Sequence, residues 1–265
     1  MKKYTQADFD AFEVIDGIKQ CPSGDYSDIQ IFGECCSFGE WCSFSKQCSF
    51  GEDCSFGERC SFGERCSFGK WCSFGERCSF GKGCSFGECC SFGKCCSFGR
   101  ACSFGRACSF GEWCSFGEYC SFGKWCSFSK QCSFGEDCSF GEECSFGEEC
   151  SFGEWCSFGK GCSFGKQCSF GACCSFGECC SFGECCSFED KGEYIGDYPF
   201  LAFVGFGSRI GSKVYFFNLQ DGIYVRCGCW LSDIAGFRER VKEKNADAMY
   251  LDLCDLVERK FDRKN

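Results

Sequence analysis

A six-residue repeat occupies most of this chain. From residue 36 to residue 191 the sequence reads Cys-Ser-Phe-Gly followed by two variable residues, 26 times without an insertion or a deletion. Glycine follows phenylalanine in all but three units, which carry Ser45, Ser129 and Glu189. Tyr26 and Phe32 fall in the phenylalanine register upstream, so the repeat begins earlier in degenerate form. A fixed period over such a length predicts a solenoid of stacked equivalent units.

The spacing inside one unit predicts its shape. Cysteine and phenylalanine are two residues apart, so a short Cys-Ser-Phe strand points both side chains to one side. Glycine then breaks the strand, and the two variable, mostly polar residues turn the chain. Burying cysteine and phenylalanine while exposing serine and the variable pair predicts a parallel β-helix, in a mainly β protein.

Read from phenylalanine, the unit Phe-Gly-x-x-Cys-Ser resembles the bacterial hexapeptide-repeat family. The resemblance implies a left-handed, triangular β-helix with three hexads in each coil. The 26 units would then form about nine coils, and the rod would be roughly 40 Å long. The chain departs from the family by carrying phenylalanine at positions where the family has aliphatic residues. A right-handed or wider solenoid stays open as the alternative.

The two ends differ from the array in composition. We expect residues 1–35 to cap the first coil with Phe9, Phe12, Val14, Ile15 and Ile18, because an open sheet edge invites aggregation. We expect 36–191 to form the solenoid and 192–265 to form a separate small α+β domain. Three strands are predicted there, at 200–206, 214–219 and 223–230, with a hairpin at Asp221-Gly222. Two helices should follow, one capped by Ser232 and ending at Lys244, the other ending near Phe261.

Both ends carry short segments that resemble uncharacterised Cys-Ser-Phe-Gly repeat proteins of gut bacteria and their phages. The segments are FEVIDGIKQCPSGDY at 12–26, DGIYVRCGCW at 221–230 and the helix beginning DIAGFRERVKE at 233. This resemblance implies an architecture and no activity.

The chain has 36 cysteines, and their positions suggest a structural role for most of them. One cysteine in each of the 26 units faces inward by the pattern, where a free thiol behaves as a small hydrophobic group. Because residues 1–12 contain no apolar stretch like a signal peptide, we expect a reducing cytoplasmic compartment, that of the host cell if the chain is phage-encoded. A thiol-rich store for zinc or copper(I) is the alternative, but Cys-x-x-Cys pairs are absent. Six cysteines are predicted to face outward, namely Cys35, Cys89, Cys95, Cys173, Cys179 and Cys185.

The chain has no histidine, which excludes most acid–base chemistry at neutral pH. There is no Ser-His-Asp or Cys-His nucleophile system, and the histidine used by acyltransferases of the hexapeptide-repeat family is missing. We therefore predict a protein that is not an enzyme, with no catalytic, cofactor-binding or metal-binding residues. Ser208, Arg209, Asp221 and Arg226 are polar positions in the C-terminal part that we expect to be solvated.

Specificity of the rod must come from the two variable positions of each unit. Residues 59–106 carry eight basic side chains against three acidic ones at these positions, whereas 135–159 carry seven acidic side chains and no basic one. Such bands favour self-association or an oppositely charged partner. Exposed tryptophans are typical of interfaces, although with three units per coil they are scattered over three faces. The interaction candidates are Arg59, Arg65, Arg77, Arg100, Arg106, Glu142, Glu143, Glu148, Glu149, Trp71, Trp113, Trp125 and Trp155.

These observations favour a non-enzymatic β-solenoid that acts as a scaffold or binding rod for protein partners or for itself. The segment 41–54 recurs identically at 125–138, fourteen units later. Because fourteen is not a multiple of three, the copy lies on another face, and a rod indifferent to face favours a scaffold over a one-sided docking surface. The alternative is a phage-type inhibitor that mimics DNA, although duplex DNA is far more densely charged. We expect neither membrane association nor direct binding of nucleic acid.

Overall fold

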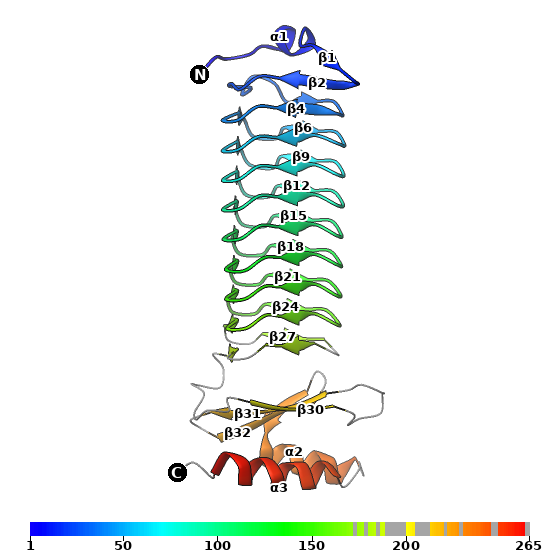
Figure 1. Ribbon diagram of the computed structural model, residues 1–265, viewed down its shortest axis with the longest axis vertical. Helices are drawn as coiled ribbons and strands as arrows, with labels where there is room; N and C mark the ends of the chain where they lie inside the picture. Colours follow the sequence, from blue (N-terminus) through cyan, green and yellow to red (C-terminus); the bar gives the residue numbers. More distant parts are fainter. Residues whose placement is uncertain are drawn as a thin grey trace.

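The computed structural model describes residues 1–171, 174–177, 180–183, 186–188, 200–204, 213–219, 222–227, 230–244 and 249–262. A parallel β-solenoid forms a straight rod, and a small sheet with two helices lies beyond its last coils (Figure 1). The predicted mainly β architecture with a small α+β region is confirmed.

Each repeat unit contributes one short strand. The first is β4 (Cys36–Phe38), and Ser–Phe pairs follow in every unit from β5 (Ser43–Phe44) to β29 (Ser187–Phe188). Each strand pairs in parallel with the strand three units further along, serine on serine and phenylalanine on phenylalanine, as between Ser73 and Ser91. Three strands therefore make one coil and three long sheets make the walls, which confirms a three-sided solenoid of about nine coils. From β5 onward the cysteine precedes the strand instead of belonging to it, because only serine and phenylalanine pair in the ladder.

The turn between strands imposes two backbone conditions. In the turns that the structure describes, the second variable residue lies in the left-handed region, with φ between 53° and 62° wherever it is not glycine. The glycine after phenylalanine lies against the coil before it, and a Cβ on Gly105 would come within 2.7 Å of the Gly87 carbonyl. Close approach of the coils therefore explains this glycine. Ser129 occupies the same position, and its N–H still donates to the Phe110 carbonyl at 3.0 Å.

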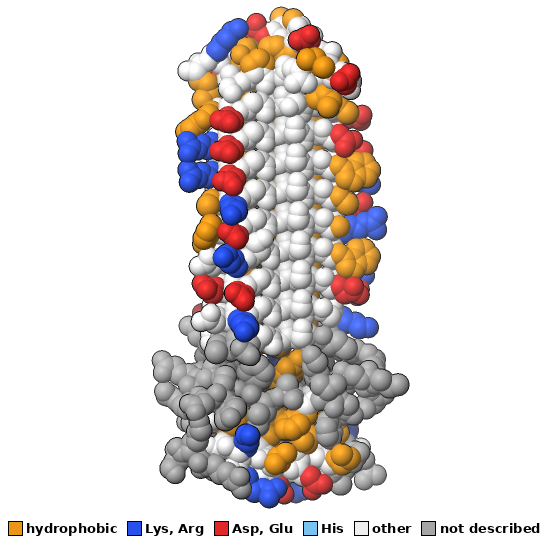
Figure 2. All heavy atoms as spheres, in the orientation of Figure 1, with side chains coloured by type: hydrophobic (Ala, Val, Ile, Leu, Met, Phe, Trp, Pro, Cys, Tyr) orange, Lys and Arg blue, Asp and Glu red, His pale blue; other side chains and the backbone are white. Residues whose placement is uncertain are grey.

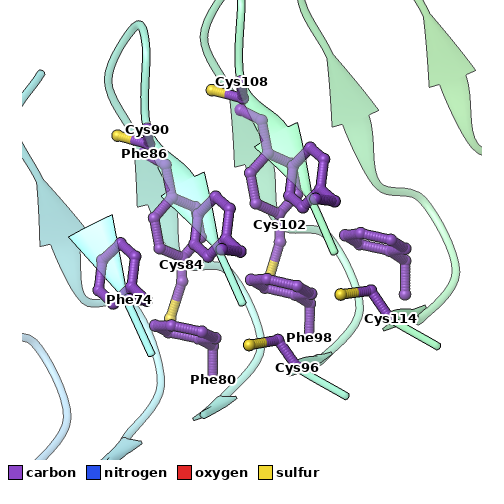
Figure 3. Packing of buried hydrophobic residues seen from close by; sticks show 14 of the residues in the cluster. Phe74, Phe80, Cys84, Phe86, Cys90, Cys96, Phe98, Cys102, Cys108 and Cys114 are labelled. Atoms are coloured by element: carbon purple, nitrogen blue, oxygen red, sulfur yellow. The ribbon is translucent and has the colours of Figure 1, made fainter. Parts of the chain in front are cut away.

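Phenylalanine fills the interior in three columns. Rings in one column stack with centroids about one rung apart, as for Phe80 and Phe98 at 4.8 Å and 2° (Figure 3). Rings of neighbouring columns meet edge to face, as for Phe104 and Phe110 at 5.1 Å and 87°. Both arrangements are favoured by the aromatic quadrupole. Because the ring planes of the three columns are almost perpendicular to one another, three large rings fit in each coil.

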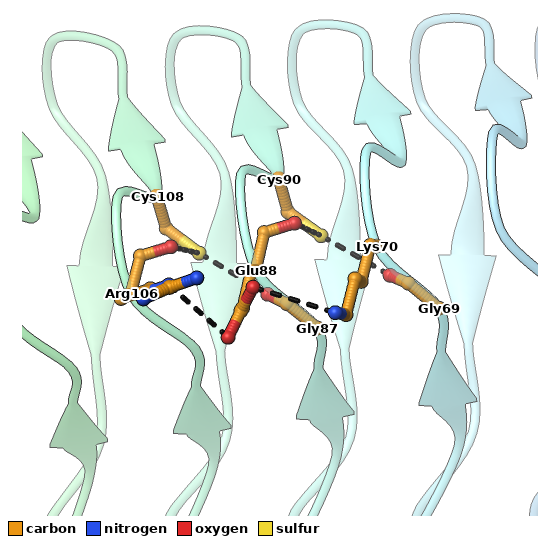
Figure 4. A network of polar contacts seen from close by, with 7 residues as sticks. All are labelled: Gly69, Lys70, Gly87, Glu88, Cys90, Arg106 and Cys108. Carbon is orange, nitrogen blue, oxygen red and sulfur yellow. Dashed lines mark hydrogen bonds and ion pairs between the residues drawn. The ribbon is translucent and has the colours of Figure 1, made fainter.

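The inward cysteines lie beside these rings, and all of them are buried except Cys174, which is partly buried. Their thiols do more than fill space, because the Cys108 Sγ donates to the Gly87 carbonyl oxygen at 3.4 Å and Cys90 does the same to Gly69 (Figure 4). The same contact recurs in almost every described coil. A thiol is a weak donor, so each of these hydrogen bonds contributes little to stability, but every coil contains about three of them. Cysteine therefore matches the site better than alanine would.

The N-terminal residues cover the first coil. Helix α1 (Gln6–Asp10) begins at Thr5 with a capping box, and β1 (Val14–Ile15), β2 (Ile18–Cys21) and β3 (Ile31–Phe32) follow. Phe9 is buried and Phe12 packs on the core, as expected, together with Tyr4. Tyr26 and Phe32 continue the phenylalanine columns, which confirms the degenerate first repeats. The prediction that Val14, Ile15 and Ile18 pack on the first coil is wrong, because these side chains are exposed. They belong to the hairpin of β1 and β2, in which β2 pairs with β4 at the end of one wall of the solenoid.

The C-terminal domain is an antiparallel sheet with two helices on one face. Its strands are β30 (Phe200–Val204), β31 (Lys213–Leu219), β32 (Gly222–Cys227) and β33 (Trp230–Asp233), paired in that order. The prediction of three strands is wrong because the chain reverses after Cys227, so that Cys227 pairs with Trp230. The hairpin between β31 and β32 is confirmed.

Both predicted helices are present and pack on the sheet. They are α2 (Ile234–Glu243) and α3 (Met249–Asp262), and Phe237 and Val257 lie with Val214 and Phe216 in one core. The cap of α2 is Asp233, whose carboxylate accepts from the Gly236 N–H at 2.7 Å, and not Ser232. Asp233 also ends β33, so this residue makes the junction between strand and helix.

The other face of this sheet meets the end of the rod. The Tyr215 hydroxyl donates to the Cys180 carbonyl at 3.0 Å, and its ring meets Phe182 edge to face. Arg226 is buried, with its guanidinium 4.4 Å from the centre of the Phe176 ring. The expectation that Arg226 is solvated is therefore wrong, because it packs on the Phe176 ring at the end of the rod. Ser208, Arg209 and Asp221 lie outside the described residues.

Candidate interaction surface: the three corners of the rod

The variable residues of the repeat gather along three corners of the rod. Successive turns on one corner are three units apart and are joined by backbone bonds, such as that from the Arg65 N–H to the Lys82 carbonyl at 2.9 Å. We name the corners by their described turns. The first corner comprises the turns 40–41, 58–59, 76–77, 94–95, 112–113, 130–131, 148–149 and 166–167. The second comprises 46–47, 64–65, 82–83, 100–101, 118–119, 136–137 and 154–155, and the third comprises 52–53, 70–71, 88–89, 106–107, 124–125, 142–143 and 160–161.

The faces between the corners are uniform. Figure 2 shows one pale face with few side chains of marked character, bordered on both sides by charged and hydrophobic groups. The serine columns provide these faces and repeat at every rung. Any recognition that depends on sequence must therefore use the corners.

The exposed aromatic residues are divided equally among the corners. Trp41 and Trp113 lie on the first corner, Tyr119 and Trp155 on the second, and Trp71 and Trp125 on the third, each about half exposed. Several are held by neighbours one coil away: the Arg59 guanidinium lies 4.6 Å from the Trp41 ring, and the Trp125 indole N–H donates to Glu143. The expectation that the aromatic residues do not form one recognition face agrees with this placement.

Charged side chains on the first and third corners pair from coil to coil. Glu88 accepts from Lys70 on one neighbouring coil and from Arg106 on the other, at 3.5 and 3.2 Å (Figure 4). Glu142 pairs with Lys124 at 2.9 Å, and this contact lowers the pKa of the Glu142 carboxyl. These pairs are exposed and each contributes little to stability. They neutralise part of the axial charge bands that the sequence shows.

The structure does not bring the predicted interaction residues together at one site. Arg59, Arg77, Trp113, Glu148 and Glu149 lie on the first corner, Arg65, Arg100 and Trp155 on the second, and Trp71, Arg106, Trp125, Glu142 and Glu143 on the third. The acidic band at 135–159 consequently encircles the rod instead of following its axis. Charges counted in bands along the sequence do not show which charges share a corner. The composition of one corner is found by grouping every third unit.

The outward cysteines are placed as predicted where the structure describes them. Cys89 on the third corner and Cys95 on the first are exposed, and Cys35 is half-buried. Cys173, Cys179 and Cys185 lie outside the described residues. Within the described part of the chain, no three Cys, Asp or Glu side chains come together as a metal-binding group.

Comparison with protein-family models, curated proteins and solved structures finds no match to this chain. The likeness to the hexapeptide-repeat type thus rests on the six-residue period and on the three-sided parallel solenoid. Among the described helices, none has the length and apolar character needed to cross a bilayer.

Proposed function

We propose that this protein is a non-enzymatic binding rod, a rigid β-solenoid that presents side chains at fixed intervals to protein partners. The observation that carries the proposal is the arrangement of the six exposed aromatic side chains on three corners. The backbone ladder holds each corner residue at a multiple of about 4.8 Å from the next along its corner. Trp71 and Trp125, for example, are three coils apart on the third corner.

The uniform interior supports this proposal. Stacked phenylalanines and paired backbones run without interruption through the described coils, so the corners have little freedom to move relative to each other. A partner that binds such a surface loses little conformational entropy in ordering it. Tryptophan and tyrosine are the residues most often found at the energetic centres of protein interfaces.

The DNA-mimic alternative has less support. A mimic needs acidic groups in rows along the rod, as the phosphates run along a duplex. Here acidic side chains alternate with basic ones along the first and third corners, and the acidic band surrounds the rod.

The test replaces four aromatic residues on the first and third corners with glutamine: Trp41, Trp71, Trp113 and Trp125. Both proteins, with the fold checked by circular dichroism, are used for quantitative affinity capture from cells of the organism that encodes the chain. We expect proteins captured by the natural chain to be depleted at least tenfold with the variant. Equal capture by both proteins would contradict a role for the corners. A control variant, Gln131→Ala with Gln167→Ala on the first corner, should capture as the natural chain does.

A further inference from the structure

The second corner differs from the other two in how its charges are distributed. Its upper part, at 46–101, carries four basic side chains and one acidic one, whereas its lower part, at 118–155, carries four acidic side chains and no basic one. The first and third corners contain both signs in each half. The basic residues of the second corner are Lys46, Arg65, Lys82 and Arg100, with Glu64 among them, and the acidic residues are Glu118, Glu136, Asp137 and Glu154.

These charges are poorly neutralised within the molecule. Among the described residues, Lys82–Glu64 at 3.5 Å is the ion pair of the second corner, and the four lower acids make no ion pair. By contrast, the other corners contain pairs that bridge the middle of the rod, such as Lys94–Glu112 and Lys124–Glu142. The second corner thus keeps a positive upper half and a negative lower half that face solvent.

A second copy of the chain, laid antiparallel along this corner, complements it. With a two-fold axis between the coils of Arg100 and Glu118, Arg100 lies opposite Glu118 of the second copy. Lys82 lies opposite Glu136 and Asp137 of that copy. Because the axis is two-fold, each of these pairs occurs twice. Both rods have the same rung spacing, so the pairs on the two coils at each side of the axis remain in register. In the next coil the turn at Glu64 and Arg65 lies opposite the turn at Glu154 and Trp155.

The sizes of the side chains also match in this arrangement. Ala101 lies opposite Tyr119 of the second copy, and Gly83 lies opposite Asp137, so the small residues of the upper half meet the larger ones of the lower half. Arg65 lies opposite Trp155, which is 58% exposed and can receive a cation on its face. A parallel arrangement would instead place like charges against each other.

We propose that this chain forms an antiparallel homodimer through its second corner, held by the complementary halves at 46–101 and 118–155. The proposal rests on the binding-rod function and names the partner of one corner as a second copy. The first and third corners stay accessible in the dimer.

The mass of the full chain is measured by sedimentation equilibrium under reducing conditions, at about 30 mM and about 500 mM salt. A dimer is expected at low salt and at least tenfold weaker association at high salt, because salt screens the charges. The variant Glu118→Lys with Glu136→Lys should be monomeric at low salt. The matched control, Glu148→Lys with Glu149→Lys on the first corner, changes the charge equally and should remain dimeric.

A complementary pair of variants tests whether the charges of the second corner hold the dimer together. Lys82→Glu with Arg100→Glu should also be monomeric alone, and mixing it with Glu118→Lys/Glu136→Lys should restore a dimer, since oppositely charged halves then face each other again. A monomeric natural chain at low salt, or a dimer that both charge reversals leave intact, would overturn the proposal. The four aromatic substitutions used to test the binding rod lie on other corners and should leave the dimer unchanged, so the two proposals fail separately.

Discussion

Phe104 of the solenoid and Phe216 of the C-terminal sheet are both buried, but they have different kinds of neighbours. Phe104 stacks between Phe86 and Phe122, both at 4.8 Å, so its environment is made of copies of itself. Phe216 contacts Phe203 and Phe237, which come from another strand and from a helix.

The difference shows two ways of specifying a core. In the solenoid, one favourable contact is found once and then repeated, so a short pattern determines the packing of a long rod. In the C-terminal domain, each contact joins different residue types that are distant in sequence. Each coil of the rod is therefore stabilised mainly by the coils next to it, whereas the C-terminal domain is stable only when all of its parts fold together.

The largest expected effect comes from removing one ring in each region. We expect Phe104→Ala and Phe216→Ala each to cost about 3–5 kcal/mol, the range for a buried phenylalanine. Phe216→Ala should unfold the C-terminal domain alone, whereas Phe104→Ala should separate the rod into two halves that unfold independently. Hydrogen exchange measured along the chain distinguishes these outcomes. Phe104→Leu is the control, and because it keeps more of the buried volume it should cost less than Phe104→Ala. A single cooperative loss of all protection in Phe104→Ala would contradict the separation.

The loss of stability at alkaline pH is a second way to compare the two regions, because both contain buried thiols. The neighbouring Cys102 thiol, together with burial, raises the pKa of Cys84 to about 12, and burial raises the pKa of Cys254 to about 11. Since an unfolded thiol ionises near pH 9, stability should be full below pH 9 and fall as the pH rises towards 11 or 12. We expect a loss on the order of 1–2 kcal/mol for the C-terminal domain.

The measurement is chemical denaturation at pH 8, 9.5 and 10.5 under reducing conditions. The variant Cys254→Ala serves as the control for other groups that titrate in this range. Its C-terminal transition should depend less on pH than that of the natural chain. An equal dependence would show that the Cys254 thiol is not the group responsible.

A smaller effect is expected from the left-handed turn residues. Ala101 has φ 57°, where a side chain is strained, whereas Gly83 occupies the equivalent turn one coil earlier with φ 69°. Ala101→Gly should stabilise the rod by about 0.5–1 kcal/mol, and Gly83→Ala should destabilise it by a similar amount. Gly222 of the C-terminal domain, at φ 144°, should respond as Gly83 does. Thermal unfolding measures all three, and a stabilising Gly83→Ala would show that the turn is relaxed.

The smallest effect is expected from the ion pairs. Glu88→Gln removes two exposed contacts, with Lys70 and Arg106, and should cost no more than about 1 kcal/mol. In the C-terminal domain Arg238 holds both Asp255 and Glu258, at 2.6 and 2.8 Å, and is less exposed. Arg238→Gln should therefore cost more than Glu88→Gln at about 50 mM salt. The two values should converge at about 1 M salt, and a difference that persists there would indicate packing instead of charge.

Much of the rod could be predicted from the sequence because its period is also its structural unit. The inward positions of cysteine and phenylalanine, the turn at the variable pair and the number of coils all follow from the six-residue spacing. The perpendicular orientation of the phenylalanine rings in different columns could not be predicted, since it depends on three strands that come together only in the closed coil. The hydrogen bond from the thiol to the glycine carbonyl could not be predicted either, because it joins residues of two neighbouring coils.

At the two ends of the chain the six-residue repeat is absent, and prediction from the sequence is less accurate. The apolar pattern of Val14, Ile15 and Ile18 indicates a cap, but the buried cap consists of Tyr4, Phe9 and neighbouring residues. The sequence places Arg226 in solvent because a charged residue in a strand usually faces outward, yet the rod end provides an aromatic surface for it. A local sequence pattern cannot predict that a residue is buried against a distant part of the chain.

The six-residue alternation of buried and exposed groups, and hence a solenoid with a thiol and phenyl interior, follow directly from the order of the amino acids. Which variable residues share a corner is settled by the folded coil, because it depends on three units closing one turn of the solenoid. Charges that form bands along the sequence thereby become paired ladders on two corners and a polarised edge on the remaining one. The physical reason is that interaction energies follow distances in space, and the closed coil brings every third unit next to its equivalent.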